Sequence, residues 1–189
     1  MGNFCGWSGK NLGPDMSRQT IAAMLLECSG ADHAESDSSY DNTGALAICS
    51  GLYATSFLEQ DGIKAAIVGS PLWDDRELAD IAIKLGPAAS LIKAYQSFGT
   101  DLLSLLHGPF SLVIMDGGDT LVAVDRLGIH RLSYAYQDRT FVFATSTGSI
   151  VRHPLIRRSM DPQAIFNYFY FHDIPSPGSY YSGVEKLLP

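Results

Sequence analysis

Residues 108–150, GPFSLVIMDGGDTLVAVDRLGIHRLSYAYQDRTFVFATSTGSI, determine most of what the sequence predicts about the fold. Apolar runs at Phe110–Met115 and Thr120–Val124 flank a turn with two glycines, a pattern that predicts a β-hairpin. A second pair of runs, Leu132–Tyr136 and Thr140–Ala144, flanks a three-residue polar turn and predicts another hairpin. We therefore expect antiparallel strands throughout this part of the chain.

Upstream of this stretch the apolar spacing becomes helical. Ile21, Met24, Leu25 and Cys28 fall at i, i+3, i+4 and i+7, which predicts one buried helix face and makes Cys28 an ordinary core residue. Asp74 or Asp75 can cap a second helix that ends at Gly86-Pro87. The other expected helices cover residues 88–98, residues 101–106 and a last segment opened by Asp161-Pro162, which carries the aromatic run 166–171 and is expected to be buried against a neighbour.

The remaining apolar runs predict strands. We expect a short first strand at 6–9 and buried strands at 45–54 and 63–68, with the polar, acidic stretch 31–43 as a loop. Strands, then helices, then strands are typical of an α+β fold with helices packed on largely antiparallel sheets.

Composition excludes several classes of function. The chain has 189 residues, 46% of them hydrophobic and 17% charged, which suits one packed domain. Its net charge is −7 and it has no Lys/Arg cluster, so we expect no nucleic-acid partner. No apolar run reaches the ~18 residues of a membrane span, and the start has no basic segment typical of a signal peptide. Three scattered cysteines predict neither a disulfide framework nor a metal site, and favour a reducing cytoplasm.

The segment 108–150 resembles the glutaminase domain of the asparagine synthetase family. The family pattern D-R-x-G-x-K-P-L-Y-Y corresponds to Asp125–Tyr134, with His130-Arg131 in place of Lys-Pro, and F-A-S-E corresponds to Phe143–Thr145. The opening C-G-I-x-G is matched by Cys5–Gly9, and the tail Gly183–Pro189 is similar to the stretch that leads into the ATP-dependent synthetase domain. The resemblance implies an N-terminal-nucleophile hydrolase fold, in which two mostly antiparallel sheets lie between helical layers in an αββα sandwich.

The resemblance also implies that Cys5 occupies the position of a nucleophile that attacks the side-chain amide of glutamine. In the family this cysteine is the first residue of the mature chain, and its α-amine is the general base. A free α-amine has a pKa near 8 and can accept a proton at neutral pH, whereas a peptide nitrogen cannot. Four residues precede Cys5, so only cleavage after Phe4 would supply this base.

Other requirements of the family's glutamine pocket are not met. No arginine lies between Arg18 and Arg76, so the residues that would grip the glutamine carboxylate are absent. The Asn-Gly pair of the oxyanion hole corresponds to Val68-Gly69, of which only Gly69 can donate its backbone N–H. The stretch that would hold the glutamine amine, residues 86–90, has no carboxylate. These matches therefore predict no substrate-binding residues.

We therefore expect a degenerate glutaminase domain over residues 1–160, with residues 161–189 as a terminal helix and connector toward a synthetase domain. β-Lactam synthetases and lasso-peptide macrolactam cyclases resemble this type, because their substrates already carry the reacting amine. We expect no cofactor in this chain, with ATP and Mg confined to the synthetase domain. That domain is the expected partner, with a homodimer as a second option. The alternatives are a glutaminase activated by cleavage before Cys5 and a free-standing scaffold protein.

Two further features have structural interpretations. Asp125-Arg126 is expected to form an ion pair or a domain contact rather than a catalytic pair. His107 precedes a predicted strand and is expected at a turn or on the surface.

Overall fold

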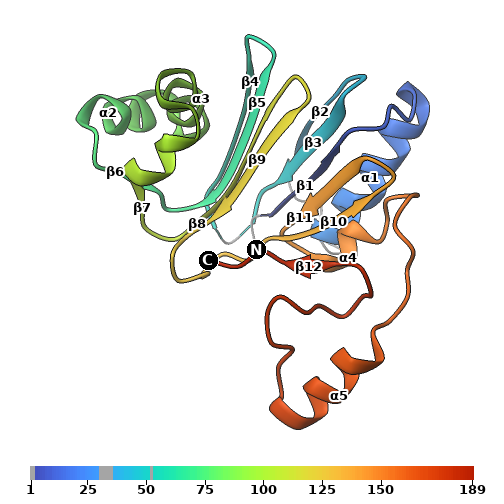
Figure 1. The fold of residues 1–189 in the computed structure, drawn as a ribbon. Helices are drawn as coiled ribbons and strands as arrows, with labels where there is room; N and C mark the ends of the chain where they lie inside the picture. The colour runs from blue at the N-terminus through green and yellow to red at the C-terminus, as the bar shows by residue number, and fades with distance from the viewer. Residues whose placement is uncertain (1–2, 30–35, 52) are drawn as a thin grey trace.

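Two antiparallel sheets are stacked face to face between two layers of helices in the computed structural model, which describes residues 3–29, 36–51 and 53–189 (Figure 1). The expected α+β fold with an αββα order of layers is therefore confirmed. Sheet A has the strand order β12-β10-β11-β1-β3-β2. Its strands are β1 (Asn3–Ser8), β2 (Ser36–Tyr40), β3 (Gly44–Cys49), β10 (Ser133–Gln137), β11 (Thr140–Ala144) and β12 (Glu185–Lys186).

Sheet B has the strand order β4-β5-β8-β9. Strands β6 and β7 form a separate two-stranded sheet. In the sequence, β6 precedes α2 and β7 follows η1. The bounds are β4 (Thr55–Gln60), β5 (Ile63–Gly69), β6 (Leu72–Trp73), β7 (Leu106–His107), β8 (Phe110–Asp116) and β9 (Asp119–Val124).

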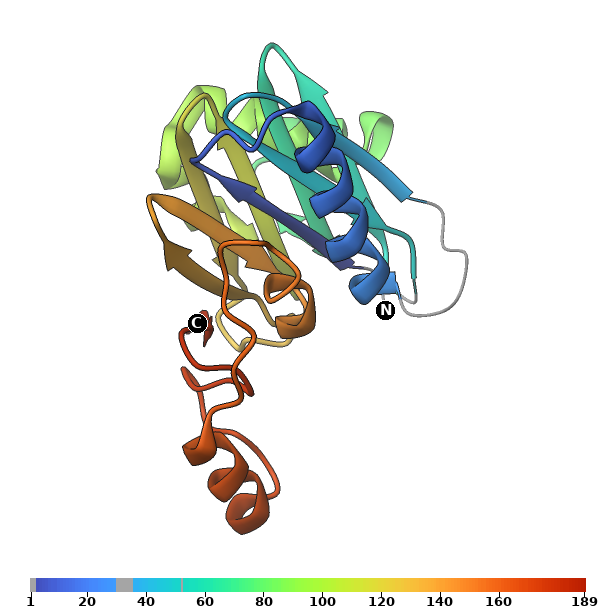
Figure 2. The ribbon, with the colours of Figure 1, turned by 90° about the vertical axis from the view of Figure 1, so that its right-hand side faces the viewer.

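Helices cover the outer face of each sheet. Helix α1 lies across sheet A together with the short α4, while α2, α3 and the 3₁₀ helix η1 pack on sheet B (Figures 1 and 2). Helix α5 stands apart from the sandwich on an arm near the C-terminal end of the chain. The bounds are α1 (Pro14–Ser29), α2 (Arg76–Leu85), α3 (Pro87–Phe98), η1 (Gly99–Leu105), α4 (Thr147–Ile150) and α5 (Pro162–Phe171).

Strand β1 lies between β11 and β3 in the middle of sheet A, and its two faces are buried under α1 and against sheet B. Cys5 and Trp7 point into the core under α1, with Met24 of that helix. Phe4 points the other way, into the core between the sheets, where its ring lies edge-on to Phe143. The alternation follows from the two-residue period of a strand.

Gly6 has a packing role that explains part of the motif around Cys5. A Cβ at this position would lie 2.3 Å from the carbonyl oxygen of Ala45 and 2.8 Å from the Phe143 ring. No side chain fits there, so the neighbouring strand and the aromatic ring can approach β1 closely.

A buried cation connects the two sheets. Lys64 of β5 is 2% exposed on the inter-sheet side and pairs with Asp41, in the turn between β2 and β3. Desolvation raises the pKa of Asp41, but hydrogen bonds from Lys64 and Thr43 outweigh it and bring the pKa to about 2. Asp41 also accepts the backbone N–H groups of Thr43 and Gly44, so the same carboxylate shapes the turn.

Several expected elements are confirmed. Both hairpins, the strand at 63–68 and the helix face of Ile21 and Met24 are present, and Asp75 caps α2 by accepting the N–H of Leu78. The loop assigned to 31–43 is partly wrong, because Ser36–Tyr40 forms edge strand β2; residues 31–35 lie outside the described residues. The strand expected over 45–54 ends at Cys49, and a separate strand β4 follows.

The expectation that the aromatic helix is buried against a neighbour is wrong in this structure. Within α5 only Ala164 is buried. Phe169 is 77% exposed and Tyr170 is 72% exposed. Burial was expected because the ten residues of α5 carry no charged side chain. The helix is exposed because the short arm holds it away from both sheets (Figure 2). The proposed division at residue 160 stays a prediction.

We expect substitution of Phe169 by alanine to change the free energy of unfolding by no more than about 0.5 kcal/mol, because its ring contacts solvent. The same substitution at Phe143, which is fully buried between the sheets, should cost about 3–5 kcal/mol. Urea denaturation followed by circular dichroism measures both. If Phe169→Ala lowered the free energy of unfolding as much as Phe143→Ala, α5 would pack on the sandwich in solution.

Candidate active site

A cavity of about 370 Å³ opens between the two sheets, beside the start of β1. We call it the inter-sheet cavity. Its walls come from both sheets and from the loop between β9 and β10, so segments far apart in the sequence meet here. The lining residues are Asn3, Tyr53, Val68, Ser111, Ile129, His130, Arg131 and Thr145.

Cys5 does not line this cavity. Its side chain is fully buried on the opposite face of sheet A, under α1. The neighbouring groups are two further free thiols, Cys28 and Cys49, and the Cys28 sulfur lies 2.9 Å from the hydroxyl of Ser149. A hydrogen bond with Cys28 and burial raise the pKa of Cys5 well above its usual value. The thiol is therefore protonated at neutral pH and shielded from solutes.

The peptide nitrogen of Cys5 lies within a strand rather than at a chain end. Strand β1 begins at Asn3, and Cys5 is in register with Ala144 on one side and Ala47 on the other. An amide nitrogen in this position cannot accept a proton from the thiol. With the chain intact, the general base that the family uses is absent from this position.

Gly69 closes β5 with a positive φ of 116° and lies beside His130, which lines the cavity. A Cβ here would come within 2.3 Å of the Pro109 carbonyl oxygen and 2.9 Å of the His130 ring, so only glycine fits. Its N–H already donates to the carbonyl oxygen of Ala54, at 2.9 Å. The oxyanion role assigned to Gly69 stays a prediction, and it would require that hydrogen bond to open.

The structure thus does not bring Cys5 and Gly69 together around one cavity. Cys5 faces the α1 side of sheet A, whereas Gly69 ends a strand of sheet B. The stretch that would hold the glutamine amine begins α3 instead: Ser90 is buried, accepts the indole N–H of Trp73 and donates to the carbonyl oxygen of Pro87. These bonds give Ser90 a structural role in the core between sheet B and its helices.

Besides the cation of Arg131, the inter-sheet cavity offers neutral hydrogen-bonding groups. The hydroxyl of Ser111 is buried and has no hydrogen-bond partner among the described residues. His130 is 8% exposed, and its ring meets Tyr53 edge-on with centroids 4.7 Å apart. Burial lowers the pKa of His130, although Asp125 opposes the shift, so the imidazole is neutral at pH 7. Sequence patterns gave no role to Ser111 or Tyr53, because strand alternation does not show which end of a strand borders a cavity.

Asp125 shapes the loop that carries His130. Its buried carboxylate accepts the backbone N–H groups of Leu127, Ile129 and His130 at 3.0, 3.2 and 3.1 Å. Desolvation raises the pKa of Asp125, but these backbone hydrogen bonds together lower it below its usual value. Of the two roles predicted for Asp125-Arg126, the ion pair is wrong, because the carboxylate turns inward to the loop backbone while Arg126 is exposed. The domain contact stays a prediction.

His107 is partly exposed at the surface, as expected, and its Nε2 lies 2.6 Å from the Asp74 carboxylate. Within residues 3–29, 36–51 and 53–189, no cluster of three or more His, Cys, Asp or Glu side chains has an arrangement that could hold a metal ion. In the same ranges, no helix has the length and apolarity required to cross a membrane.

Comparison with known proteins agrees with this architecture. The family profile described as "Glutamine amidotransferase domain" matches residues 87–189. "Asparagine synthetase [glutamine-hydrolyzing] 3" of Bacillus subtilis (strain 168) is 26% identical over 102 residues, which cover 52% of this chain and 17% of that protein. The chain therefore spans only a small part of this relative.

Two solved structures share the fold. A glutamine phosphoribosylpyrophosphate amidotransferase from B. subtilis, complexed with ADP and GMP, superposes with a TM-score of 0.53 at 15% identity and covers 86% of this chain and 46% of its own. A structure described as the allosteric regulatory enzyme of purine biosynthesis superposes with a TM-score of 0.54 at 15% identity. The match covers 86% of this chain and 45% of that chain. Both are similar in fold, and the chain spans about half of each.

We expect all three thiols to resist modification in the folded protein, because Cys5, Cys28 and Cys49 are buried. The reagent DTNB should label them on the order of 10³-fold more slowly than a cysteine introduced at exposed Lys10, and should label all of them quickly in guanidinium. Peptide mass spectrometry identifies the labelled residue. Rapid labelling of Cys5 without denaturant would contradict its buried position.

Replacing Asp125 with alanine should lower the free energy of unfolding by about 2–4 kcal/mol, because three backbone N–H groups lose their acceptor. The control Asp80→Ala removes an exposed carboxylate on α2 and should change stability by less than about 0.5 kcal/mol. Chemical denaturation of both variants at neutral pH measures the difference.

The stabilisation by Asp125 should also depend on pH in a defined direction. Because its pKa is lower in the folded than in the unfolded chain, the stabilisation is complete above the unfolded value of about 3.9 and is lost as the pH falls through the folded pKa. The difference in free energy of unfolding between the wild-type chain and Asp125→Ala should therefore become smaller in acid. A difference that widens below pH 4 would contradict the hydrogen-bonded carboxylate.

Proposed function

Since this chain belongs to the glutamine amidotransferase domain family, we propose that it is the amidotransferase-like domain of an ATP-dependent amide-forming enzyme and that it does not itself hydrolyse glutamine. It serves as the structural partner of a synthetase domain of the asparagine synthetase type, on the same or a companion chain. ATP and Mg bind to that domain, and this chain needs no cofactor.

The observation that carries the proposal is the position of Cys5. A catalytic thiol has to reach both its substrate and a base. The Cys5 side chain is 0% exposed, its pKa is raised, and its nitrogen is an amide inside β1. The N–H of Gly69 already donates to the carbonyl oxygen of Ala54, so it is not free to stabilise an oxyanion.

Loss of glutaminase activity has a chemical rationale in this family. An enzyme that activates a carboxylate with ATP needs ammonia only if its substrate brings no amine. Where the amine is already on the substrate, as in β-lactam or macrolactam formation, the glutamine pocket is free to change. The sequence between Arg18 and Arg76, which has no arginine, fits this type of substrate.

The exposed aromatic arm supports the partner role. Large apolar side chains concentrate on and around α5, and a patch of this kind on a folded protein marks an interaction surface. The members at least 40% exposed are Met160, Ile165, Phe166, Tyr168, Phe169, Tyr170, Phe171 and Tyr180.

One observation favours a second candidate function. Cys5–Gly9 keeps the family's opening motif, so proteolytic removal of residues 1–4 would leave Cys5 with a free α-amine. Cleavage would also remove Phe4, which fills the core between the sheets, and the start of β1 would then be free to rearrange. Under this alternative the domain is a glutaminase that supplies ammonia.

The two candidates differ in one assay. We expect no ammonia release from millimolar glutamine by the intact chain, and none by a chain lacking residues 2–4, from which methionine aminopeptidase removes Met1 to expose Cys5. Intact mass confirms each N-terminus, and near-ultraviolet circular dichroism confirms folding. Glutamine should also leave the melting temperature of both forms unchanged.

The control is Cys5→Ala in the shortened chain. Ammonia release that depends on exposing Cys5 and disappears in Cys5→Ala would overturn the proposal and establish the glutaminase. A background that is equal in both forms would come from a contaminant. If the shortened chain does not fold, the intact mass of the protein isolated from its own cells decides, since an uncleaved N-terminus excludes the mechanism.

A further inference from the structure

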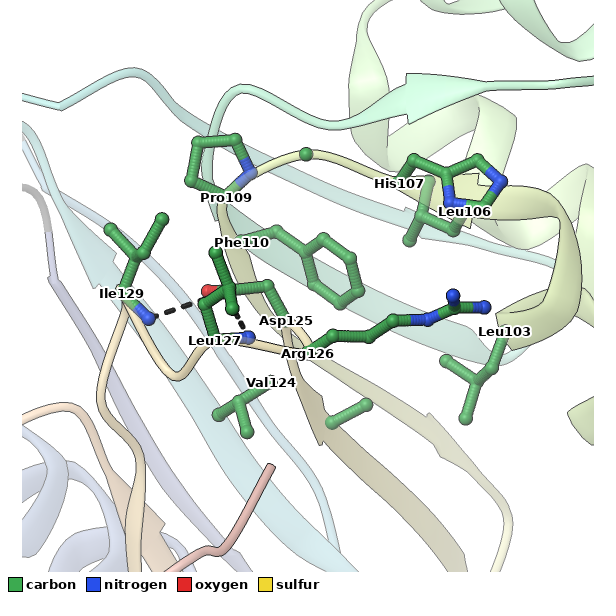
Figure 3. Close-up of a pocket in the computed structure, with 12 residues that line it drawn as sticks. Leu103, Leu106, His107, Pro109, Phe110, Val124, Asp125, Arg126, Leu127 and Ile129 are labelled. Carbon is green, nitrogen blue, oxygen red and sulfur yellow. Dashed lines mark hydrogen bonds between the residues drawn. The ribbon is translucent and has the colours of Figure 1, made fainter.

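A second and larger cavity, of about 560 Å³, lies on the helix side of sheet B. We call it the lateral cavity (Figure 3). It is bounded by the end of η1, the start of β8, the end of β9 and the loop that follows. Its volume falls within the range of 300–1,000 Å³ that is usual for small-molecule sites.

The lateral cavity has apolar walls. Its floor consists of Leu106, Phe110 and Ala123, each of them buried in the core between sheet B and its helices. Its rim includes Leu127 and Ile129, which are 81% and 57% exposed. Exposed leucine and isoleucine beside an apolar hollow leave surface that a ligand with an apolar body would cover.

One unpaired cation lies at this apolar site. The Arg126 side chain runs along the cavity, with its guanidinium pointing toward Leu103 and His107 (Figure 3). It makes no hydrogen bond or ion pair with any residue in the described ranges. This cation is notable in a chain with a net charge of −7.

The nearby carboxylates do not neutralise Arg126. Asp125 is 3% exposed, and both of its oxygens accept backbone N–H groups of its own loop. Asp74 is paired with His107, which lines the cavity. A ligand with one carboxylate would therefore find one free guanidinium, which can pair with both carboxylate oxygens.

The site is also held in place before any ligand binds. The Asp125 hydrogen bonds to the backbone of Leu127 and Ile129 fix the loop that carries Arg126 and both rim residues (Figure 3). A preorganised site loses less conformational entropy on binding than a mobile loop would.

We propose that the lateral cavity binds a monocarboxylate with an apolar body, such as a medium-chain fatty acid. The alkyl chain lies over Phe110 and Ala123, and the carboxylate pairs with the guanidinium of Arg126. The cavity shares only Ile129 with the inter-sheet cavity, and Cys5 has no part in it. The proposal therefore goes beyond the proposed function and does not depend on it.

The test is a titration of the ¹⁵N-labelled full chain with octanoate, octanol and octyl phosphate, followed by two-dimensional NMR. Octanoate should bind saturably, with shifts centred on the amides of Leu127 and Ile129. Octanol should bind at least about ten-fold more weakly, because it cannot form a charge-assisted pair with Arg126. From hexanoate to octanoate the affinity should rise about four-fold for each added methylene.

Two variants separate the charge from the apolar wall. Arg126→Met keeps the alkyl stem and removes the charge, so it should weaken octanoate about ten-fold and leave octanol unchanged. The matched control Arg158→Met removes an exposed arginine outside the cavity and should have no effect. Ala123→Leu fills the floor and should weaken octanoate and octanol alike.

Several results would overturn the proposal. Equal affinity for octanoate and octanol, or an Arg126→Met variant that binds octanoate normally, would show that the charge is not used. Tighter binding of octyl phosphate would assign a different ligand class. Shifts away from Leu127 and Ile129, or none that saturate, would show that the cavity is not a ligand site.

Discussion

The central position of β1 in sheet A is the constraint on which the rest of the structure depends. A strand with a neighbour on each side and a packed layer on each face can only be built from side chains that suit both cores. Phe4 fills the space between the sheets, while Cys5 and Trp7 fill the space under α1. Helix α1 can approach sheet A closely because the residues opposite Cys5, Ala47 and Ala144, are small. The start of the chain thus joins three of the four layers.

The same constraint accounts for the chemistry of Cys5. In an N-terminal-nucleophile hydrolase the first residue combines a nucleophile and a base at a free chain end. Here the strand continues upstream through Asn3 and Phe4, so Cys5 becomes an interior residue with a raised pKa. A motif that resembles a catalytic signature is compatible with a purely structural role, since Gly6 is required for the close approach of Ala45 and Phe143. Motif and activity are separate properties of this fold.

The loop that follows β9 organises the other side of the molecule. Asp125 uses its carboxylate to hold the loop backbone, so residues on either side of Gly128 face different surroundings. His130 points toward the inter-sheet cavity, whereas Arg126 extends along the lateral cavity. Loop geometry therefore explains the Asp125-Arg126 pair: the aspartate is an internal cap of the loop, and the arginine is free to contact something else.

The sequence by itself determined the elements whose signals are local. Apolar runs around short turns predicted both hairpins, although the second turn has two residues rather than the expected three. Helical spacing predicted α1 to α3, with a cap at Asp74 or Asp75 and an end at Gly86 for α2. Family motifs gave the layer order. Only the tertiary structure decided the rest, because each case depends on partners distant in the chain. Edge strand β2 forms from a polar segment because β3 supplies its hydrogen bonds. Helix α5, uncharged and aromatic, stays exposed because the arm holds it off the sandwich. Cys5 is buried because strands from both halves of the chain enclose it.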